Sequence, residues 1–361
     1  MKFLCYLFCI IVLFTSLKAQ SEDSTETINP IAEPLLIFSY DSNIGFGYGV
    51  KCFFLNFLKS RESFDIILFN STKGERWYRF VFSIPDFELR QGKKYPMAVD
   101  LTFDYDNLIA NYFYGTGNQS SYDSRIKYTH KLVELNLTIN RGFSSKFVSQ
   151  LAISYKMIKN SNIQETPKLK IQYPQLTPSR IEYSSLIFDI RYDSRDSYIN
   201  PSKGIVLDGK IEFAPNLPLN SVSFMQWSTW LQYYREVFIK KVILAMRFGL
   251  QEIRGKSLPI QVLIPLGSNR TLRGYSLDRF LDKSAALFNA EIRFPIYWRF
   301  GGIIGMDTGR VWESIEKFSF MQWHTNAVLG LRFYLQTYIV RLDMGFSHEI
   351  TGLYLNFNHI F

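Results

Sequence analysis

The segment Lys241-Val-Ile-Leu-Ala-Met-Arg-Phe-Gly-Leu-Gln251 alternates between apolar and mixed positions along its whole length. The apolar positions are Val242, Leu244, Met246, Phe248 and Leu250. An α-helix would spread residues 242, 244 and 246 around its circumference, whereas a β-strand places them all on one face. The segment therefore predicts an amphipathic β-strand.

Two further segments repeat this period of two. In residues 287–294 the apolar face carries Phe288, Ala290, Ile292 and Phe294, opposite Asn289, Glu291 and Arg293. In residues 339–347 it carries Val340, Leu342, Met344 and Phe346, opposite Arg341, Asp343, Gly345 and Ser347. Such a face is the core of a water-soluble sandwich or the lipid-facing surface of a membrane barrel. The period alone leaves both architectures open.

Segments of this kind fill residues 34–361, and we predict sixteen strands. They span residues 34–40, 45–57, 62–72, 76–88, 96–106, 124–140, 145–158, 180–192, 204–215, 221–238, 241–254, 283–297, 299–309, 318–334, 337–348 and 351–361. Long connections, at 107–123, 159–179 and 255–282, follow odd-numbered strands, and the connections after even-numbered strands are mostly short. Bacterial outer-membrane barrels have long outer loops and short periplasmic turns. We therefore predict an all-β, transmembrane antiparallel barrel.

The first 19 residues have the features of a secretory signal peptide. Met1-Lys2 gives a basic start, residues 3–17 are uncharged and mostly apolar, and Ala19 offers a small residue at a cleavage point. An uncleaved anchor helix is the alternative, although the apolar run is short for a membrane span. We interpret the polar, acidic residues 20–33 as a short periplasmic tail before a barrel domain of residues 34–361.

Composition argues against several other classes of protein. No apolar stretch of about 18 residues follows the signal, so we expect no transmembrane helix. The net charge is +9, but the 41 basic residues are scattered among 32 acidic ones, so we expect no nucleic-acid partner. The four histidines, at positions 130, 324, 348 and 359, are dispersed, and only one cysteine, Cys52, follows the signal. We therefore expect neither an enzyme nor a metal or other cofactor.

Three motifs follow one another in the second half of the chain. They are Gly267-Ser-Asn-Arg-Thr-Leu-Arg-Gly-Tyr275 with Asp278-Arg-Phe280, Asn289-Ala-Glu-Ile-Arg-Phe-Pro295, and Met306-Asp-Thr-Gly-Arg-Val-Trp312. Three further segments belong with these motifs: residues 113–118 in the third predicted outer loop, and residues 189–196 with 201–204 around a predicted periplasmic turn. In their order and spacing, these segments resemble the BamA/TamA-like bacterial surface antigen (D15) superfamily of outer-membrane barrels, over nearly all of residues 34–361. Members of that group insert proteins into outer membranes or translocate them.

The resemblance implies that the sixth outer loop folds into the barrel lumen with the Leu-Arg-Gly-Tyr segment at its tip. Arg273 would then pair with Glu291 and Asp307 on the inner wall of the twelfth and thirteenth strands. Alternation agrees, because both acids fall on the polar faces of their strands. A guanidinium can meet a carboxylate through two hydrogen bonds, which fixes its orientation as well as its place. The alternative is that Arg273 is a solvated loop residue.

The glycines and the tyrosine of these motifs complete the expected loop lock. Gly274, before Tyr275, would let the loop turn tightly. Gly305 and Gly309 would leave space for the loop on the wall.

The predicted last strand, residues 351–361, ends at an aromatic residue. Its apolar face would carry Leu353, Leu355, Phe357, His359 and Phe361. A final phenylalanine on an amphipathic strand resembles the signal that barrel-assembly machinery reads. We assign that signal to Tyr354, Phe357 and Phe361.

The expected N-terminal tail differs from the family pattern. The assembly and secretion members of the group carry periplasmic POTRA domains before the barrel, and residues 20–33 are too few for one. We therefore expect a barrel without POTRA domains, embedded in outer-membrane lipid. It would assist protein assembly or translocation with separate periplasmic or outer-membrane partners and client proteins. The alternative is a channel or structural barrel without insertase activity.

Overall fold

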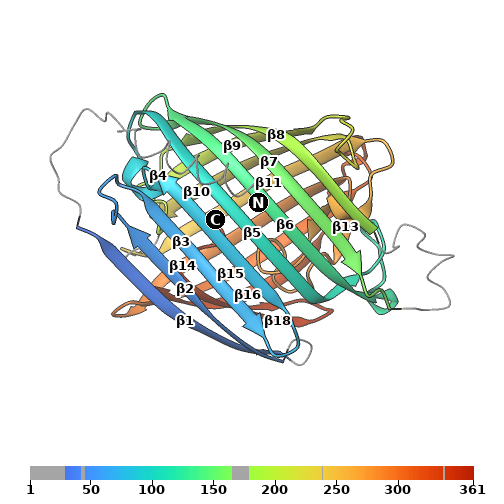
Figure 1. Cartoon of the computed structure of the whole chain (residues 1–361). Coiled ribbons are helices and arrows are strands. Elements are labelled where there is room, and N and C mark those ends of the chain that lie inside the picture. The colour runs from blue at the N-terminus through green and yellow to red at the C-terminus, as the bar shows by residue number, and fades with distance from the viewer. Residues whose placement is uncertain (1–28, 42–44, 165–178, 238, 336–337) are drawn as a thin grey trace.

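The computed structural model describes residues 29–41, 45–164, 179–237, 239–335 and 338–361. These residues form a sixteen-stranded sheet curled into a barrel (Figure 1). A separate two-stranded sheet of β12 (Ile264–Leu266) and β13 (Phe280–Asp282) packs against the strands. The expected signal, residues 1–19, lies outside the described residues. The prediction of a sixteen-stranded, all-β barrel is confirmed.

The strands of the large sheet follow one another in chain order, apart from the insertion of β12 and β13. The first eight are β1 (Ile31–Asp41), β2 (Gly45–Leu55), β3 (Ser63–Ser71), β4 (Arg76–Ile84), β5 (Tyr95–Phe113), β6 (Ile126–Gly142), β7 (Phe147–Ser161) and β8 (Ser179–Asp193). The other eight are β9 (Gly204–Ala214), β10 (Phe224–Glu236), β11 (Ile243–Gly255), β14 (Ser284–Tyr297), β15 (Phe300–Trp312), β16 (His324–Tyr334), β17 (Ile339–Phe346) and β18 (Thr351–Phe357). The helical turns are α2 (Phe87–Arg90), η1 (Tyr122–Ser124), η2 (Ile260–Val262) and η3 (Ile315–Lys317). Within the described residues, no helix has the length and hydropathy of a membrane span.

The two faces of the sheet differ in polarity. Neighbouring strands are antiparallel, and successive side chains along each strand point to opposite faces of the sheet. In β11, Phe248 is exposed on the outside, whereas Arg247 on the other face is buried. Other large apolar side chains are exposed along the outside, such as Ile153, Leu207 and Leu329. An apolar outer face around a polar interior is the pattern of a membrane barrel and excludes a water-soluble sandwich.

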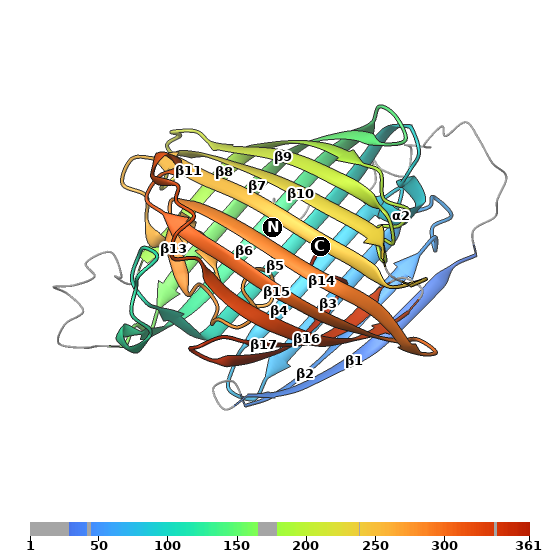
Figure 2. The same ribbon diagram turned by 180° about the vertical axis from the view of Figure 1, so that it is seen from behind.

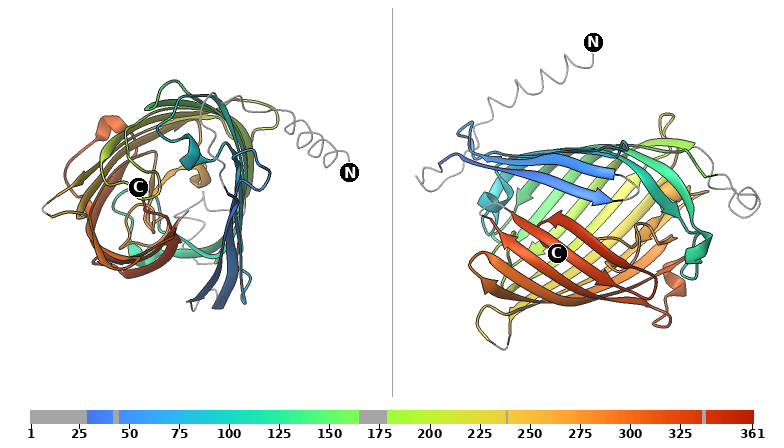
Figure 3. Two further views of the ribbon diagram at one scale, coloured as in Figure 1. Left: turned by 90° about the vertical axis from the view of Figure 1, so that its left-hand side faces the viewer. Right: turned by 90° about the horizontal axis from the view of Figure 1, so that it is seen from below.

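The sheet is open between its first and last strands. β1 pairs with β2 and β18 pairs with β17, and no ladder joins β1 to β18 among the described residues. The right-hand view of Figure 3 shows the N-terminal strands diverging from the C-terminal ones, while Figure 2 shows β9, β10, β11, β14 and β15 side by side in one continuous wall. We call the gap between β1 and β18 the seam.

The end of β4 differs from the prediction. The strand stops at Ile84 rather than at residue 88, because Pro85 has no N–H group to donate to a ladder. The side chain of Asp86 then accepts hydrogen bonds from the backbone N–H groups of Glu88 (2.9 Å) and Leu89 (3.3 Å). These bonds cap α2, which turns the chain towards β5.

Other predicted boundaries also shift. β1 begins at Ile31, so residues 31–33, which were expected in the tail, belong to the barrel. β5 continues to Phe113 rather than residue 106, and β16 begins at His324 rather than residue 318. β18 ends at Phe357, not at the last residue. Asn358 has a φ of 59°, a left-handed conformation that asparagine tolerates better than most residues and that ends the strand. The prediction that Phe361 lies on the lipid face is therefore wrong: its side chain is buried.

The sixth outer loop, residues 256–283, folds back against the inner wall, and we call it loop 6. Its β12 and β13 pair as a short hairpin. Leu266, Leu272 and Phe280 of the loop are fully buried and belong to one apolar cluster with Leu287 and Val311 of the wall. Burying a side chain of this size stabilises a fold by about 1.5–3 kcal/mol. This apolar cluster therefore holds the loop inside the barrel.

Candidate functional site

The tip of loop 6 is shaped by its own backbone. The N–H of Ser268 donates to the carbonyl of Tyr275 at 2.9 Å, which closes the tip. The hydroxyl of Thr271 accepts from the N–H of Gly267 (2.8 Å) and donates to its carbonyl (2.7 Å). These bonds fix the chain on both sides of Arg273 and direct its side chain at the wall.

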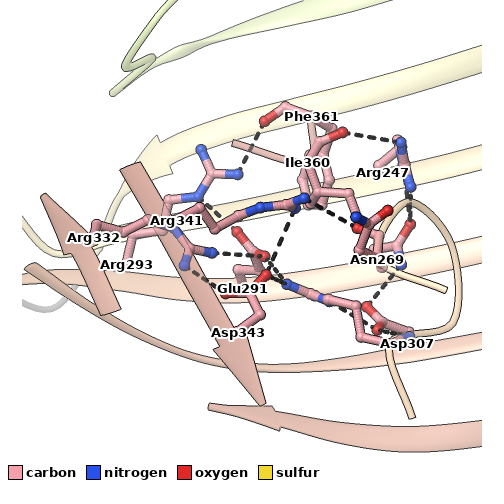
Figure 4. Close-up of polar contacts among 12 residues, drawn as sticks. Arg247, Asn269, Glu291, Arg293, Asp307, Arg332, Arg341, Asp343, Ile360 and Phe361 are labelled. Atoms are coloured by element: carbon pink, nitrogen blue, oxygen red, sulfur yellow. Dashed lines mark hydrogen bonds and ion pairs between the residues drawn. The ribbon is translucent and has the colours of Figure 1, made fainter. Parts of the chain in front are cut away.

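Arg273 is fully buried and contacts three carboxylates. These belong to Glu291, Asp307 and Asp343, which are labelled in Figure 4. Its Nε and Nη2 donate to the two oxygens of Asp307 at 2.9 and 2.7 Å, and its Nη1 donates to Glu291 at 2.5 Å. The same Nη1 lies 3.1 Å from Asp343. Burial alone would lower the pKa of Arg273, but Asp307 and Glu291 raise it well above its usual value. The guanidinium is therefore charged and held in one orientation.

The carboxylates are themselves held in place by neighbours on the wall. Asn289 and Asn326 donate to Asp307 at 2.7 and 3.0 Å, and Arg293 donates to Glu291 at 2.9 Å. Asn289 and Asp307 are directly paired between β14 and β15. Residues of the wall thus hold these acceptors in place, which reduces the entropy that docking of the loop loses.

Gly274 is needed for close packing rather than for a turn. It does not adopt a left-handed conformation. A Cβ at Gly274 would lie 2.6 Å from the Cβ of Asn326 and 2.9 Å from the backbone of Phe346 and Ser347. The expected role of this glycine in a tight turn is replaced by contact with β16 and the end of β17.

Tyr275 anchors the tip next to Gly274. Its buried ring packs edge-on against Phe280 and lies between His324 and His348. Burial raises the pKa of Tyr275, so the phenol stays protonated and donates to the carbonyl of Thr325 at 3.3 Å. The hydroxyl of Tyr354 in turn donates to the carbonyl of Tyr275 at 3.1 Å.

The two wall glycines differ in what they face. A Cβ at Gly309 would lie 3.0 Å from the side chain of Leu266 in loop 6, so this position does leave room for the loop. A Cβ at Gly305 would instead meet the carbonyl oxygen of Ala290 at 2.5 Å. Gly305 therefore allows close contact with β14 rather than with the loop, contrary to expectation.

Sequence reasoning missed part of this site. Asp343, Arg332 and Arg341 join the buried charges around Arg273. Gly345 also lies against the loop, since a Cβ there would sit 2.2 Å from the carbonyl oxygen of Arg273. The alternation in residues 339–347 placed Arg341, Asp343 and Gly345 on the polar face, but nothing in that pattern indicated how close they come to Arg273.

The predicted C-terminal signal residues do not share a face. Tyr354 points at loop 6, and the ring of Phe357 packs edge-on against Tyr338 at 5.8 Å. Phe361 packs with Tyr234 on the opposite wall, with ring centroids 6.3 Å apart. Their role as an assembly signal stays a prediction.

A second arginine fastens loop 6 to its neighbouring outer loops. Arg279 donates through Nε and Nη2 to the two carboxylate oxygens of Glu349, each at 2.7 Å. It also donates to the side-chain and backbone oxygens of Ser120. One side chain thus joins the third, sixth and eighth outer loops.

We expect Arg279→Ala to loosen these three loops while Arg273 stays docked. Glu349 would be left nearly buried without its partner, at a cost of about 1–3 kcal/mol. Protease cleavage of intact cells within residues 114–125 should become faster. The matched control is Lys317→Ala, whose side chain is 64% exposed and pairs at the surface with Glu313, itself 60% exposed, and which should change little. Equal cleavage rates for both variants would contradict the role of Arg279.

The sequence carries a family signature over the same region. The model of the Omp85 superfamily domain matches residues 56–347. The chain belongs to the Omp85 superfamily. The predicted resemblance to BamA-like barrels is thus confirmed. A search of the curated proteins finds no match.

Solved structures share this Omp85 fold. The chain is similar to BamA from Haemophilus ducreyi lacking POTRA domains 1-3, at 14% identity and a TM-score of 0.58, over 90% of this chain and 69% of that one. It is also similar to CdiB from Acinetobacter baumannii (12%, TM-score 0.53, 91% and 58%) and CdiB from Escherichia coli (12%, TM-score 0.61, 92% and 62%). The chain spans less than two thirds of either CdiB chain. At these identities the likeness establishes the fold alone.

Proposed function

We propose that this Omp85 barrel assists the insertion of proteins into the outer membrane or their passage across it. The observation that carries the proposal is the seam, where β1 and β18 lack a ladder with each other. The proposed location is the outer membrane, reached through the predicted signal of residues 1–19. The proposed partners are separate periplasmic or outer-membrane proteins and client chains. The proposal includes no enzymatic step.

The seam supports this function for a physical reason. Unpaired backbone N–H and C=O groups inside the hydrocarbon layer cost several kcal/mol each, so an open sheet edge there attracts another strand. Strand addition to an exposed edge is a common way to bind an extended chain. Both edges also carry exposed apolar side chains, Leu36 and Phe38 on β1 and Leu353 and Leu355 on β18. An incoming amphipathic strand would therefore match the seam in hydrogen bonding and in polarity.

Loop 6 supports a sideways route for the client. The loop is fixed inside the barrel, against the wall, by Arg273 and by its apolar cluster. A chain that enters from the periplasm would meet this loop before the outer opening. We propose that clients leave through the seam, or that they pass through the lumen only when loop 6 moves.

Depletion of the protein followed by quantification of the outer-membrane proteome tests this function. We expect the levels of a subset of other outer-membrane or surface proteins to fall. Re-expression of the wild-type chain should restore these levels. Re-expression of a variant in which a disulfide joins β1 to β18, and so closes the seam, should not restore them. Unchanged levels of every other outer-membrane protein after full depletion would refute the proposal.

A channel or structural barrel without insertase activity is the second candidate. It is favoured by a cavity of about 350 Å³ between loop 6 and the wall of β6–β11, lined by charged and amide side chains such as Glu134, Lys156 and Gln251. A channel should give stepwise single-channel currents in planar bilayers. Loss of client proteins on depletion, with no conductance, would favour assembly over this alternative.

A further inference from the structure

The charges around Arg273 do not balance. The buried arginines are Arg247, Arg273, Arg293, Arg332 and Arg341, and the buried acids of the same cluster are Glu291, Asp307 and Asp343. None of these eight side chains is more than 9% exposed. Positive side chains exceed negative ones by two, and the carboxylate of the last residue, Phe361, which accepts from Arg293 at 3.0 Å, offsets one of these charges. A buried surplus of like charge is unfavourable unless a counter-charge is near.

The surplus charge coincides with unused hydrogen-bond donors. Among the described residues, Nη1 of Arg293, Nε and Nη2 of Arg332, and Nε and Nη1 of Arg341 are buried without an acceptor. Nη2 of Arg332 lies 3.7 Å from Glu291, and Nη1 of Arg341 lies 3.6 Å from Asp343. Both distances are too long for hydrogen bonds. Five buried donor nitrogens on three strands, β14, β16 and β17, therefore lack an acceptor oxygen.

The end of the chain already places oxygens at the edge of this cluster. Arg293 donates to a carboxylate oxygen of the last residue, Phe361, at 3.0 Å, and Arg247 donates to the carbonyl oxygen of Ile360 at 3.2 Å (Figure 4). The ring of Phe361 lies 5.1 Å from the guanidinium carbon of each arginine. His359 also lies 3.2 Å from Asn200 in the turn between β8 and β9. The chain end thus covers Arg293 and Arg247 on the side where β18 ends.

We propose that Arg293, Arg332 and Arg341 form a binding site for a phosphate-type oxyanion, and that residues 358–361 compete with the anion for it. The site goes beyond the proposed function and does not depend on it. Loop 6 contributes Arg273 to the same cluster, so an anion bound there would add to the forces that hold the loop.

The donor geometry favours phosphate over a simple carboxylate. Five free N–H-bearing nitrogens approach from three separate strands. A carboxylate offers two oxygens in one plane, whereas a phosphate offers oxygens in several directions. Arginine forks suit phosphate oxygens, and bonds to a charged acceptor are stronger than neutral ones. The phosphate can come from the free ion or from a lipid headgroup that enters through the seam.

Equilibrium dialysis of the purified full chain with radiolabelled inorganic phosphate, in a neutral detergent, tests the site. Wild type should bind weakly because its own end competes. Phe361→Ala removes the ring that lies on Arg293 and Arg247 and should bind phosphate at least tenfold more tightly. Adding Arg341→Gln to Phe361→Ala should weaken binding by about tenfold or more, since charge-assisted bonds are lost.

Two controls keep the result interpretable. Arg299→Gln changes an exposed arginine in the turn between β14 and β15 and should leave binding unchanged. Arg341→Lys, also added to Phe361→Ala, keeps the charge but loses the planar fork of the guanidinium. It should therefore also weaken phosphate binding relative to Phe361→Ala alone. If Phe361→Ala binds no better than wild type, or if both Arg341 variants bind as well as Phe361→Ala, the site does not exist.

A second binding experiment, in lipid nanodiscs, identifies the source of the phosphate. The chain is placed in nanodiscs of phosphatidylcholine with or without phosphatidic acid. Competition with inorganic phosphate only in the discs that contain phosphatidic acid would assign the site to a lipid headgroup. Equal binding of inorganic phosphate in both discs would assign it to the free ion.

Discussion

Arg273→Ala is expected to lower the free energy of unfolding of the barrel by about 3–5 kcal/mol, the range for breaking a buried ion pair by removing one partner. Glu291 and Asp343 keep Arg293 and Arg332 as partners. Asp307 keeps only the amides of Asn289 and Asn326. The loss therefore falls mainly on Asp307, whose charge would stay buried without a cation.

The measurement is the temperature at which the folded barrel loses its fast mobility on a gel, together with urea unfolding. Arg270→Ala is the matched control, because Arg270 is exposed and lies three residues earlier in loop 6. An exchange of charges, Arg273→Asp with Asp307→Arg, should recover part of the loss. If the single changes were silent and the exchange gave no recovery, the pairing would have no energetic role.

The pairing of Arg273 with Glu291 and Asp307 could be predicted from sequence because two independent signals agreed. The motif resemblance supplied the loop arginine, and the period of two supplied the inward direction of both acids. For Asp343 only the period of two was present, which indicates an inward direction but no partner. Its distance from Arg273 depends on how strongly the sheet curves between β15 and β17, and local sequence does not determine that curvature.

The end of the chain shows a different limit. The apolar alternation of residues 351–361 continues past Phe357, so the pattern predicts a longer strand. The backbone of Asn358 alone redirects the last residues. Phe361 then gains two guanidiniums and the ring of Tyr234 as neighbours. Aromatic rings bind cations well when both lose water, but no local pattern reveals such partners on strands far apart in the chain.

Gly345→Ala should displace loop 6 although it removes no charge. The new Cβ would lie 2.2 and 2.3 Å from the carbonyl oxygen and carbon of Arg273. These are backbone atoms and cannot rotate away, so the loop must move and the bonds of Arg273 must lengthen. Overpacking of this kind costs about 1–3 kcal/mol. In a strand without such a contact, alanine should be no worse than glycine.

Gly209→Ala on β9 is the matched control, because a Cβ there has open space within 4 Å. Gel mobility after heating and protease cleavage of loop 6 should change for Gly345→Ala and not for Gly209→Ala. The double variant Arg273→Ala with Gly345→Ala sharpens the test. Both changes act on the same contact, so their combined cost should fall well below the sum of the single costs. Full additivity would show that Gly345 acts on stability by a route that does not include Arg273.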